Sequence, residues 1–165
     1  LEGSPHISFS VAAKEDLPLI AGDSQKLGQM GRLLFDESRS TLSKGGEIEV
    51  RISKTDDGAS LETIFIDNGK LIEKRDLERL FDPFFVQQNK PEELGTNLMA
   101  CYLTVFYHGG TIRAEQTADG RNSIIFTLPV EPGEVKSTDS VTRLFDRIAE
   151  FNGNDLRANS AVIPS

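Results

Sequence analysis

Hydrophobic and polar positions alternate in residues 6–11 and 47–53, and with three further stretches bounded by turn signals the chain predicts five β-strands. The stretches are residues 6–11, 47–53, 60–67, 111–116 and 123–128. A period of two places one face of each strand toward a core. Asp57-Gly58 and Asp119-Gly120 are turn signals between the second and third and between the last two stretches. Each of these pairs is therefore expected to form a hairpin.

A helical period of apolar residues appears twice between these strands. Asp23 or Ser24 can cap a first helix, whose apolar face carries Leu27, Met30, Leu34 and Leu42, with Leu33 beside it. Gly45-Gly46 is expected to end it. Residues 96–108 predict a buried helix with apolar positions at Leu98, Cys101, Tyr102 and Val105, stopped by Gly109-Gly110. Residues 73–80 predict a short helix, and a loop follows it to residue 94.

This order of elements predicts an α+β two-layer sandwich, with a mixed, mostly antiparallel sheet and helices on one face. Residues 1–5 are expected to be a linker or a remnant left by trimming, and residues 6–130 the folded domain. Residues 131–140 are rich in Pro, Gly, Ser and charge, which is typical of a linker. Residues 141–165 are expected to form an amphipathic helix and a tail. The helix has one apolar face (Val141, Leu144, Phe145, Ile148 and Phe151), which packs on the same domain or on a partner.

Composition narrows the possible functions. The 165 residues carry a net charge of −8, which argues against a nucleic-acid-binding surface. A single cysteine, Cys101, excludes an intrachain disulfide and a cysteine metal cluster; it is expected to be a buried, small apolar residue. The sequence has no apolar run of the ~18 residues that cross a membrane, and it does not begin with Met. A fragment from the cytoplasm is the expectation.

Four short motifs occur in a fixed order and carry a resemblance to a known family. They are the helix that runs from 22–27 (GDSQKL) through 33–39 (LLFDESR), then 67–72 (DNGKLI), then 81–85 (FDPFF), and finally 95–99 (GTNLM) with the helix that ends at His108-Gly109-Gly110. They resemble the Asn box, the first glycine box, the phenylalanine box and the second glycine box of the histidine kinase ATPase domain. Four motifs in order over ~120 residues are a stronger signal than any one of them. Gyrase-type enzymes and certain chaperones share this Bergerat-type ATPase fold.

The resemblance implies a set of ATP-binding residues. Asp67 would accept a hydrogen bond from the adenine amino group, a donor that guanine lacks at that position. Asp36 stands where the family usually has the Asn that ligates Mg²⁺ beside the phosphates, and Arg39 stands where it often has a Lys. The full set implied for ATP is Asp36, Arg39, Asp67, Gly69, Ile72, Phe84, Gly95, Thr96 and Leu98, with Asp36 as the Mg²⁺ ligand. Each of these residues also has an ordinary structural explanation: Asp36 and Arg39 as exposed helix residues, Asp67 as a turn residue before a glycine, and Phe84 as a core residue.

Several positions depart from the family pattern. Leu71 replaces the second glycine of the first box, and Asn97 and Met99 replace two glycines of the second box. Glycines in such loops permit close backbone approach to phosphates, so Leu71 and Met99 place bulk where a ligand is expected. Arg32 stands where the gyrase-like branch has a Glu that activates water, which argues against hydrolysis by that route.

Two functions therefore remain open. The first is the catalytic domain of a sensor histidine kinase, which binds Mg-ATP and phosphorylates a His on a separate helical dimerisation domain. The second is a degenerate, non-catalytic signalling or scaffolding module with weak or no ATP binding, and the residues at 36, 71, 97 and 99 favour it. The resemblance implies further partners: a response regulator, and a second copy in a full-length homodimer. It also implies a cytoplasmic location, with a membrane-anchored sensor as one possible setting.

Overall fold

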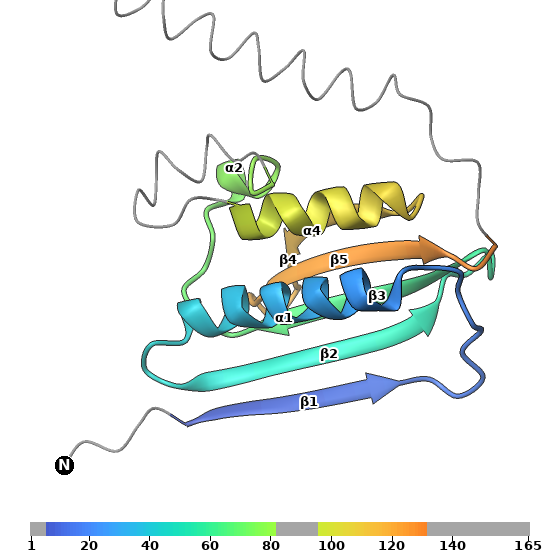
Figure 1. Ribbon diagram of the computed structural model, residues 1–165. Helices are drawn as coiled ribbons and strands as arrows, with labels where there is room; N and C mark the ends of the chain where they lie inside the picture. Colours follow the sequence, from blue (N-terminus) through green and yellow to red (C-terminus); the bar gives the residue numbers. More distant parts are fainter. Residues whose placement is uncertain (1–5, 82–95, 132–165) are drawn as a thin grey trace, which may run out of the picture. The chain divides into compact units, whose positions relative to one another are not determined.

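The computed structural model describes residues 6–81 and 96–131, and all of them lie in one compact unit that spans Leu1–Pro132. Five strands form one sheet in the order β1-β2-β3-β5-β4 (Figure 1). Their bounds are β1 (Ile7–Ala13), β2 (Gly46–Lys54), β3 (Ser60–Asp67), β4 (Thr111–Gln116) and β5 (Asn122–Pro129). β1 and β2 pair in parallel, while the other three pairings are antiparallel. The predicted mixed, mostly antiparallel sheet is confirmed.

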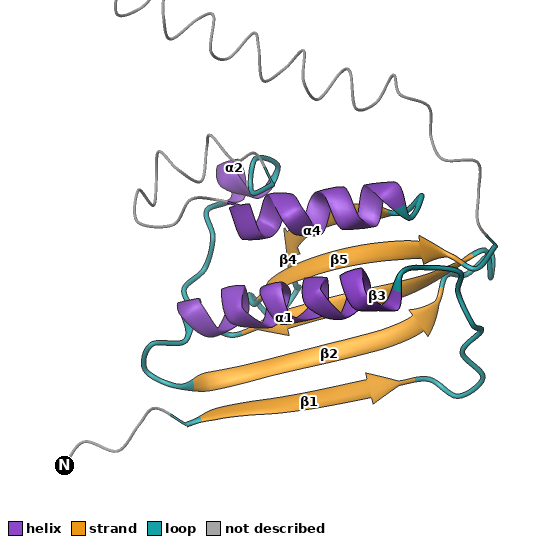
Figure 2. Cartoon of the chain, viewed as in Figure 1, coloured by secondary structure: helices purple, strands orange, loops and turns teal. Residues whose placement is uncertain are grey.

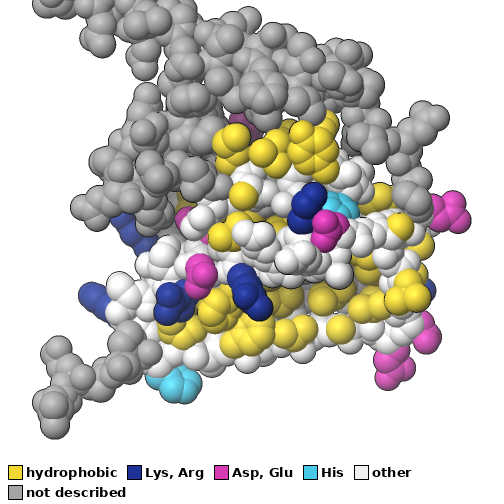
Figure 3. All heavy atoms as spheres, viewed as in Figure 1, with side chains coloured by type: hydrophobic (Ala, Val, Ile, Leu, Met, Phe, Trp, Pro, Cys, Tyr) yellow, Lys and Arg dark blue, Asp and Glu magenta, His cyan; other side chains and the backbone are white. Residues whose placement is uncertain are grey.

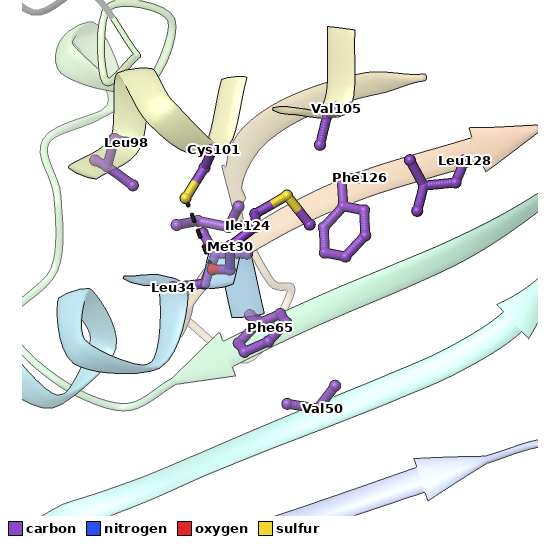
Figure 4. Close-up of a cluster of buried hydrophobic side chains, with 10 residues drawn as sticks. All are labelled: Met30, Leu34, Val50, Phe65, Leu98, Cys101, Val105, Ile124, Phe126 and Leu128. Carbon is purple, nitrogen blue, oxygen red and sulfur yellow. Dashed lines mark hydrogen bonds between the residues drawn. The ribbon is translucent and has the colours of Figure 1, made fainter. Parts of the chain in front are cut away.

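Three helices are described: α1 (Ser24–Thr41), α2 (Lys74–Leu77) and α4 (Thr96–Tyr107). α1 and α4 lie side by side on one face of the sheet (Figure 2). Their apolar faces and the facing strands enclose a single cluster of buried side chains (Figure 4): Met30, Leu34, Val50, Phe65, Leu98, Cys101, Val105, Ile124, Phe126 and Leu128. This two-layer arrangement confirms the predicted α+β sandwich.

α1 begins where the sequence predicts. The Asp23 side chain accepts hydrogen bonds from the backbone N–H groups of Gln25 and Lys26, both at 3.0 Å, and so caps the helix. The helix ends at Thr41, four residues before the glycine pair that was expected to stop it. Gly45, with φ of 90°, instead turns the chain, and Gly46 is already the first residue of β2. The short second helix is also smaller than predicted, because it covers only Lys74–Leu77.

β3 and β5 are neighbours in the sheet although the helices α2 and α4 and the strand β4 lie between them in the sequence. Their register places Asp67, the last residue of β3, opposite Asn122, the first residue of β5. Both side chains are buried, with 7% and 3% of their surface exposed. This pairing brings two polar residues together beneath the helices, at one end of the sheet.

β1 is an edge strand that the helices cover incompletely. Phe9 packs against Phe35 of α1, with ring centroids 5.4 Å apart, yet Phe9 and Val11 remain more than half exposed. Figure 3 shows hydrophobic side chains along this side of the molecule, below the charged side chains that α1 presents to solvent.

Candidate functional site

The site is centred on Asp67, where β3 ends and the chain leaves the sheet through Asn68-Gly69. A buried carboxylate requires hydrogen-bond donors, because burial without them costs several kcal/mol. Oδ1 of Asp67 accepts three such bonds: from Thr41 Oγ1 at 3.1 Å, from the Gly69 backbone N–H at 3.0 Å and from Asn122 Nδ2 at 3.0 Å. Between described residues, the hydrogen bonds of this carboxylate all use the one oxygen.

The Asn122 side chain holds the segment that follows Asp67 through hydrogen bonds to its backbone. Its Nδ2 also donates to the backbone carbonyl of Lys70 at 3.0 Å, and its Oδ1 accepts from the backbone N–H of Ile72 at 3.0 Å. The carbonyl of Ile72 in turn accepts from Gln116 Nε2 at 2.8 Å. The segment 67–72 is therefore held from β4 and β5, and both backbone groups of Ile72 are engaged.

Gly69 allows close packing between this segment and the end of α1. A Cβ atom at position 69 would overlap Thr41 Oγ1 and lie 2.6 Å from Thr41 Cβ. Since real Cβ atoms essentially never approach another heavy atom so closely, a residue with a side chain would force α1 and the segment apart. The predicted role of Gly69 beside a ligand stays a prediction, and this contact is a second reason for a glycine.

Asp36 and Arg39 lie on the solvent-exposed side of α1. The Arg39 Nε and Asp36 Oδ1 atoms are 3.7 Å apart, and both side chains are more than half exposed. An exposed pair of this kind is weak, so either group can turn to another partner. The same helix ends at Thr41, which contacts Asp67, and five residues of helix rise about 7.5 Å along the axis. α1 therefore connects the Asp67 network to the pair that was predicted to serve the phosphates and the metal.

The remaining predicted ATP-binding residues fall into three groups. Phe84 and Gly95 lie outside the described residues. Thr96 is the first residue of α4. Leu98 is 2% exposed and belongs to the hydrophobic core, where it packs with the other members of the cluster. The structure therefore joins Asp67, Gly69 and Ile72 into one network and puts Asp36 and Arg39 on the helix that contacts it.

The three positions where glycines of the family pattern are replaced, Leu71, Asn97 and Met99, all lie in the described part of the chain. Leu71 is one of the exposed large hydrophobic residues, with 48% of its surface accessible, although its neighbours on both sides are fastened by Asn122. Asn97 is exposed and Met99 is half-buried on the first turn and a half of α4. The Leu71 side chain thus points largely to solvent and away from the core.

Sequence reasoning missed Thr41, Gln116 and Asn122, which hold the site together. Thr41 ends a helix and Asn122 begins a strand, and polar residues at such ends are common enough to give no signal by themselves. The signal that identifies Asn122 is its register position opposite Asp67, which requires the pairing of β3 with β5. That pairing joins residues 55 positions apart.

Cys101 is fully buried, as predicted. Its Sγ lies 3.8 Å from the backbone carbonyl of Met30, the contact drawn as a dashed line in Figure 4. Burial, with a smaller contribution from Glu37, raises the pKa of this thiol to about 12. Thiolate is the nucleophilic form, so Cys101 is a packing residue and not a nucleophile.

Metal-ligating side chains do not cluster in the part of the chain that the structure describes, where no group of three or more His, Cys, Asp or Glu residues comes together. The Mg²⁺ ligand role of Asp36 stays a prediction. Within residues 6–81 and 96–131, no helix has the length and apolar character needed to span a membrane.

Comparison with known proteins places the chain in a family. The family described as "Histidine kinase-, DNA gyrase B-, and HSP90-like ATPase" matches residues 22–132. The sensor histidine kinase ZraS of Escherichia coli is 29% identical over 127 residues, which cover 77% of this chain and 26% of ZraS. The sensor protein TdiS of Thauera aromatica is 35% identical over 94 residues, or 57% of this chain and 16% of TdiS. The chain thus spans about a quarter or less of these relatives.

Solved structures show the same fold. A mycobacterial sensor histidine kinase, MprB, superposes with a TM-score of 0.65 at 24% identity, over 77% of this chain and 84% of that one. The catalytic domain of the histidine kinase ThkA gives a TM-score of 0.65 at 21% identity, over 77% of this chain and 82% of that one. Because the family match covers residues 22–132, both layers of the sandwich and the Asp67 network included, the chain belongs to the histidine kinase-, DNA gyrase B- and HSP90-like ATPases.

Proposed function

We propose that this chain is the ATP-binding, catalytic domain of a sensor histidine kinase. The observation that carries the proposal is the buried carboxylate of Asp67, which is fixed through one oxygen at the end of a central strand. A fixed acceptor in a site partly shielded from water suits a single amino donor, such as the one on the adenine ring. Its family relatives include proteins named as sensor histidine kinases.

The nucleotide would extend from Asp67 along α1 toward Asp36 and Arg39. Arg39 offers positive charge to phosphate oxygens, and the exposed Asp36 carboxylate offers a hard oxygen ligand to Mg²⁺. A bound Mg²⁺ would offset the negative charge of the phosphates. The predicted contacts of Phe84, Gly95, Thr96 and Leu98 with ATP remain part of the proposal, and for Leu98 the contact would have to come from its backbone or from a shift of its buried side chain.

The reaction proposed is transfer of the γ-phosphoryl group to a histidine on a separate helical dimerisation domain. The bond between the γ-phosphorus and the β–γ bridging oxygen breaks, and ADP keeps the bonding electron pair. A phosphorus–nitrogen bond forms to the imidazole, which releases its proton to solvent. In such reactions the protein contributes mainly positioning and charge stabilisation. A response regulator, homodimerisation of the whole protein and a cytoplasmic setting belong to this proposal.

The alternative, a non-catalytic module, rests on the residues at positions 36, 71, 97 and 99. Nothing in residues 6–81 and 96–131 favours it over the catalytic function, because Leu71 is largely exposed and the Asp36 carboxylate is accessible. The two functions differ in one measurable property, which is the affinity for Mg-ATP.

Thermal melting with and without Mg-ATP tests the proposal. A nucleotide present at 100 times its dissociation constant stabilises the folded chain by about 2.7 kcal/mol. We expect this shift for the wild type and its loss in Asp67→Asn, which keeps an acceptor for the three internal donors but turns an amide toward the base. Asp57→Asn is the matched control, since Asp57 lies in the exposed β2–β3 turn, and it should respond to Mg-ATP as the wild type does. The absence of a wild-type shift at millimolar Mg-ATP would refute ATP binding.

A further inference from the structure

Thr41 and Asn122 donate hydrogen bonds to the Asp67 carboxylate, and these bonds affect which purine base the carboxylate can bind. Three groups converge on Oδ1 of Asp67: the Gly69 N–H and the Asn122 amide, each at 3.0 Å, and the Thr41 hydroxyl at 3.1 Å, whose one proton is shared with the Ser38 carbonyl at 2.8 Å. A carboxylate oxygen has two lone pairs, so two donors already saturate it. The acceptor capacity that remains on the carboxylate is therefore concentrated on Oδ2.

The orientation of the Asn122 amide is fixed by the kinds of groups around it. The Ile72 backbone N–H can only donate, so it must face the amide oxygen. The Lys70 carbonyl and the Asp67 carboxylate can only accept, so they must face the amide nitrogen. All the hydrogen-bonding groups of Asn122 are thereby used, and its side chain, only 3% exposed, has one position. The Asn122 side-chain amide is therefore held in the orientation in which its nitrogen donates to Asp67.

This arrangement distinguishes the two purine bases. Adenine presents one amino donor beside a ring nitrogen that only accepts, so a single carboxylate oxygen is the matching partner. Guanine presents two adjacent donors, its ring N–H and its amino group, which pair with both oxygens of a carboxylate at once. Paired recognition of this kind is the stronger and more specific one, provided that both oxygens are available.

We propose that Thr41 and Asn122 are specificity-determining positioning residues, which occupy one oxygen of Asp67 and so exclude the two-donor edge of guanine from the nucleotide site. The inference rests on the proposed adenine site at Asp67 and deepens it. Neither residue needs to touch the nucleotide, because each acts through the carboxylate. Thr41 also ends the helix that carries Asp36 and Arg39, so the same contact fixes the distance between the base and the phosphate side of the site.

The test compares Mg-ATP and Mg-GTP binding to the full chain by isothermal titration calorimetry. Thr41→Val removes the hydroxyl while it keeps the shape, and Thr41→Ser restores the hydroxyl. Ser40→Ala is the control, because Ser40 is exposed and, among the described residues, its hydroxyl donates to the Glu37 carbonyl of its own helix. Because removal of either residue alone leaves two donors on Oδ1, we expect the double variant Thr41→Val/Asn122→Ala to narrow the ratio of ATP to GTP affinity about ten-fold, a change that one hydrogen bond to a charged group can produce. Thr41→Ser and Ser40→Ala should keep the wild-type ratio.

The narrowing should come from a gain in GTP affinity, because a loss of packing would weaken the binding of both nucleotides alike without a change in the ratio. The single variants Thr41→Val and Asn122→Ala each leave two donors on Oδ1 and should keep a ratio close to that of the wild type. If the wild type binds ATP and the double variant keeps the wild-type ratio, the inference is wrong while the proposed function stands. If the wild type binds neither nucleotide, the proposed function fails and the inference fails with it.

Discussion

The backbone N–H of Asp23 donates a hydrogen bond to Nε2 of His108 over 3.0 Å, which ties the start of α1 to the end of α4. The other ring nitrogen, Nδ1, lies 2.7 Å from the backbone carbonyl of Thr104. One partner only donates and the other only accepts, so the imidazole is neutral with its proton on Nδ1. Gly22 makes room for the ring, because a Cβ at that position would lie 2.9 Å from His108 Cδ2.

His108→Ala should destabilise the domain by about 1–2 kcal/mol, since it leaves the Asp23 N–H without its acceptor and loosens the contact between the two helices. Urea unfolding at pH 7.5 measures the change. The other histidine of the chain supplies the control: His6 is exposed, and only its backbone carbonyl takes part in the described hydrogen bonds. If His6→Ala costs as much as His108→Ala, the bridge between α1 and α4 contributes nothing.

Asp23 should make the stability of α1 depend on pH. The backbone N–H of Lys26 and then that of Gln25 lower the pKa of this carboxyl below its usual range, because both donate to the charged form. A lowered folded-state pKa gives stability that is complete above the ordinary value near 4 and is lost as the pH falls through the lowered pKa. Asp23→Asn keeps a capping oxygen but has no charge. Its melting temperature should therefore lie below that of the wild type at pH 7 and approach it as the pH falls to 2.5.

The difference between these two proteins should be a few degrees at pH 7 and close to zero at pH 2.5, which thermal melting by circular dichroism can resolve. Asp23→Ala removes the cap at every pH and serves as the reference for its full loss. A constant gap between wild type and Asp23→Asn across the acidic range would mean that the charge of Asp23 does not stabilise the helix.

Local patterns predicted most of the fold. The strand predicted over residues 60–67 has the bounds of β3, and of the two predicted caps, Asp23 and Ser24, it is Asp23 that satisfies the first free N–H groups of α1. The end of α1 was placed wrongly, because a glycine pair signals a turn but does not show whether the helix reaches it. The helix stops at Thr41, and the hydroxyl of that residue bonds Asp67.

The sequence motifs pointed to Asp67 as the centre of the candidate site, but not to the residues that hold its side chain. Asp67 stands in a recognisable motif, while Asn122 becomes significant only when β5 pairs with β3. Pairings between distant strands leave no local pattern in a single sequence, because each strand pairs through backbone groups that every residue has. Leu98 illustrates the converse: its motif position predicted a ligand contact, and its apolar side chain lies in the core.

Gly69→Ala should separate α1 from the segment after β3. The added Cβ would overlap the Thr41 hydroxyl, so the variant must move one of the two, and overpacking of this kind typically costs about 1–3 kcal/mol. Gly28→Ala is the matched control, since a Cβ at that helical position meets nothing within 4 Å. The control should gain about 0.5–1 kcal/mol, because alanine favours the helix more than glycine does. Equal effects of the two substitutions in urea unfolding would contradict the close packing at Thr41.

Cys101 should make the domain less stable in alkaline solution. Burial raises the pKa of its thiol from an ordinary value of 9.0 to about 12, so between these values the folded chain keeps a proton that the unfolded chain releases. Stability attributable to the thiol is therefore complete below pH 9 and declines above it, by at most about 1.4 kcal/mol per pH unit. Lysine and tyrosine groups also titrate in this range, so the comparison is with Cys101→Ala, which shares all of them.

The free energy of unfolding of the wild type should fall more steeply between pH 8 and pH 10.5 than that of Cys101→Ala, although the variant starts lower because it leaves a cavity beside Met30. Urea titrations at four or five pH values give both curves. The same burial predicts that iodoacetamide labels the native chain slowly at pH 8 and the urea-unfolded chain rapidly, because only the thiolate reacts. Parallel pH curves for the two proteins, together with fast native labelling, would mean that the α1–α4 interface opens to solvent far more often than a buried thiol allows.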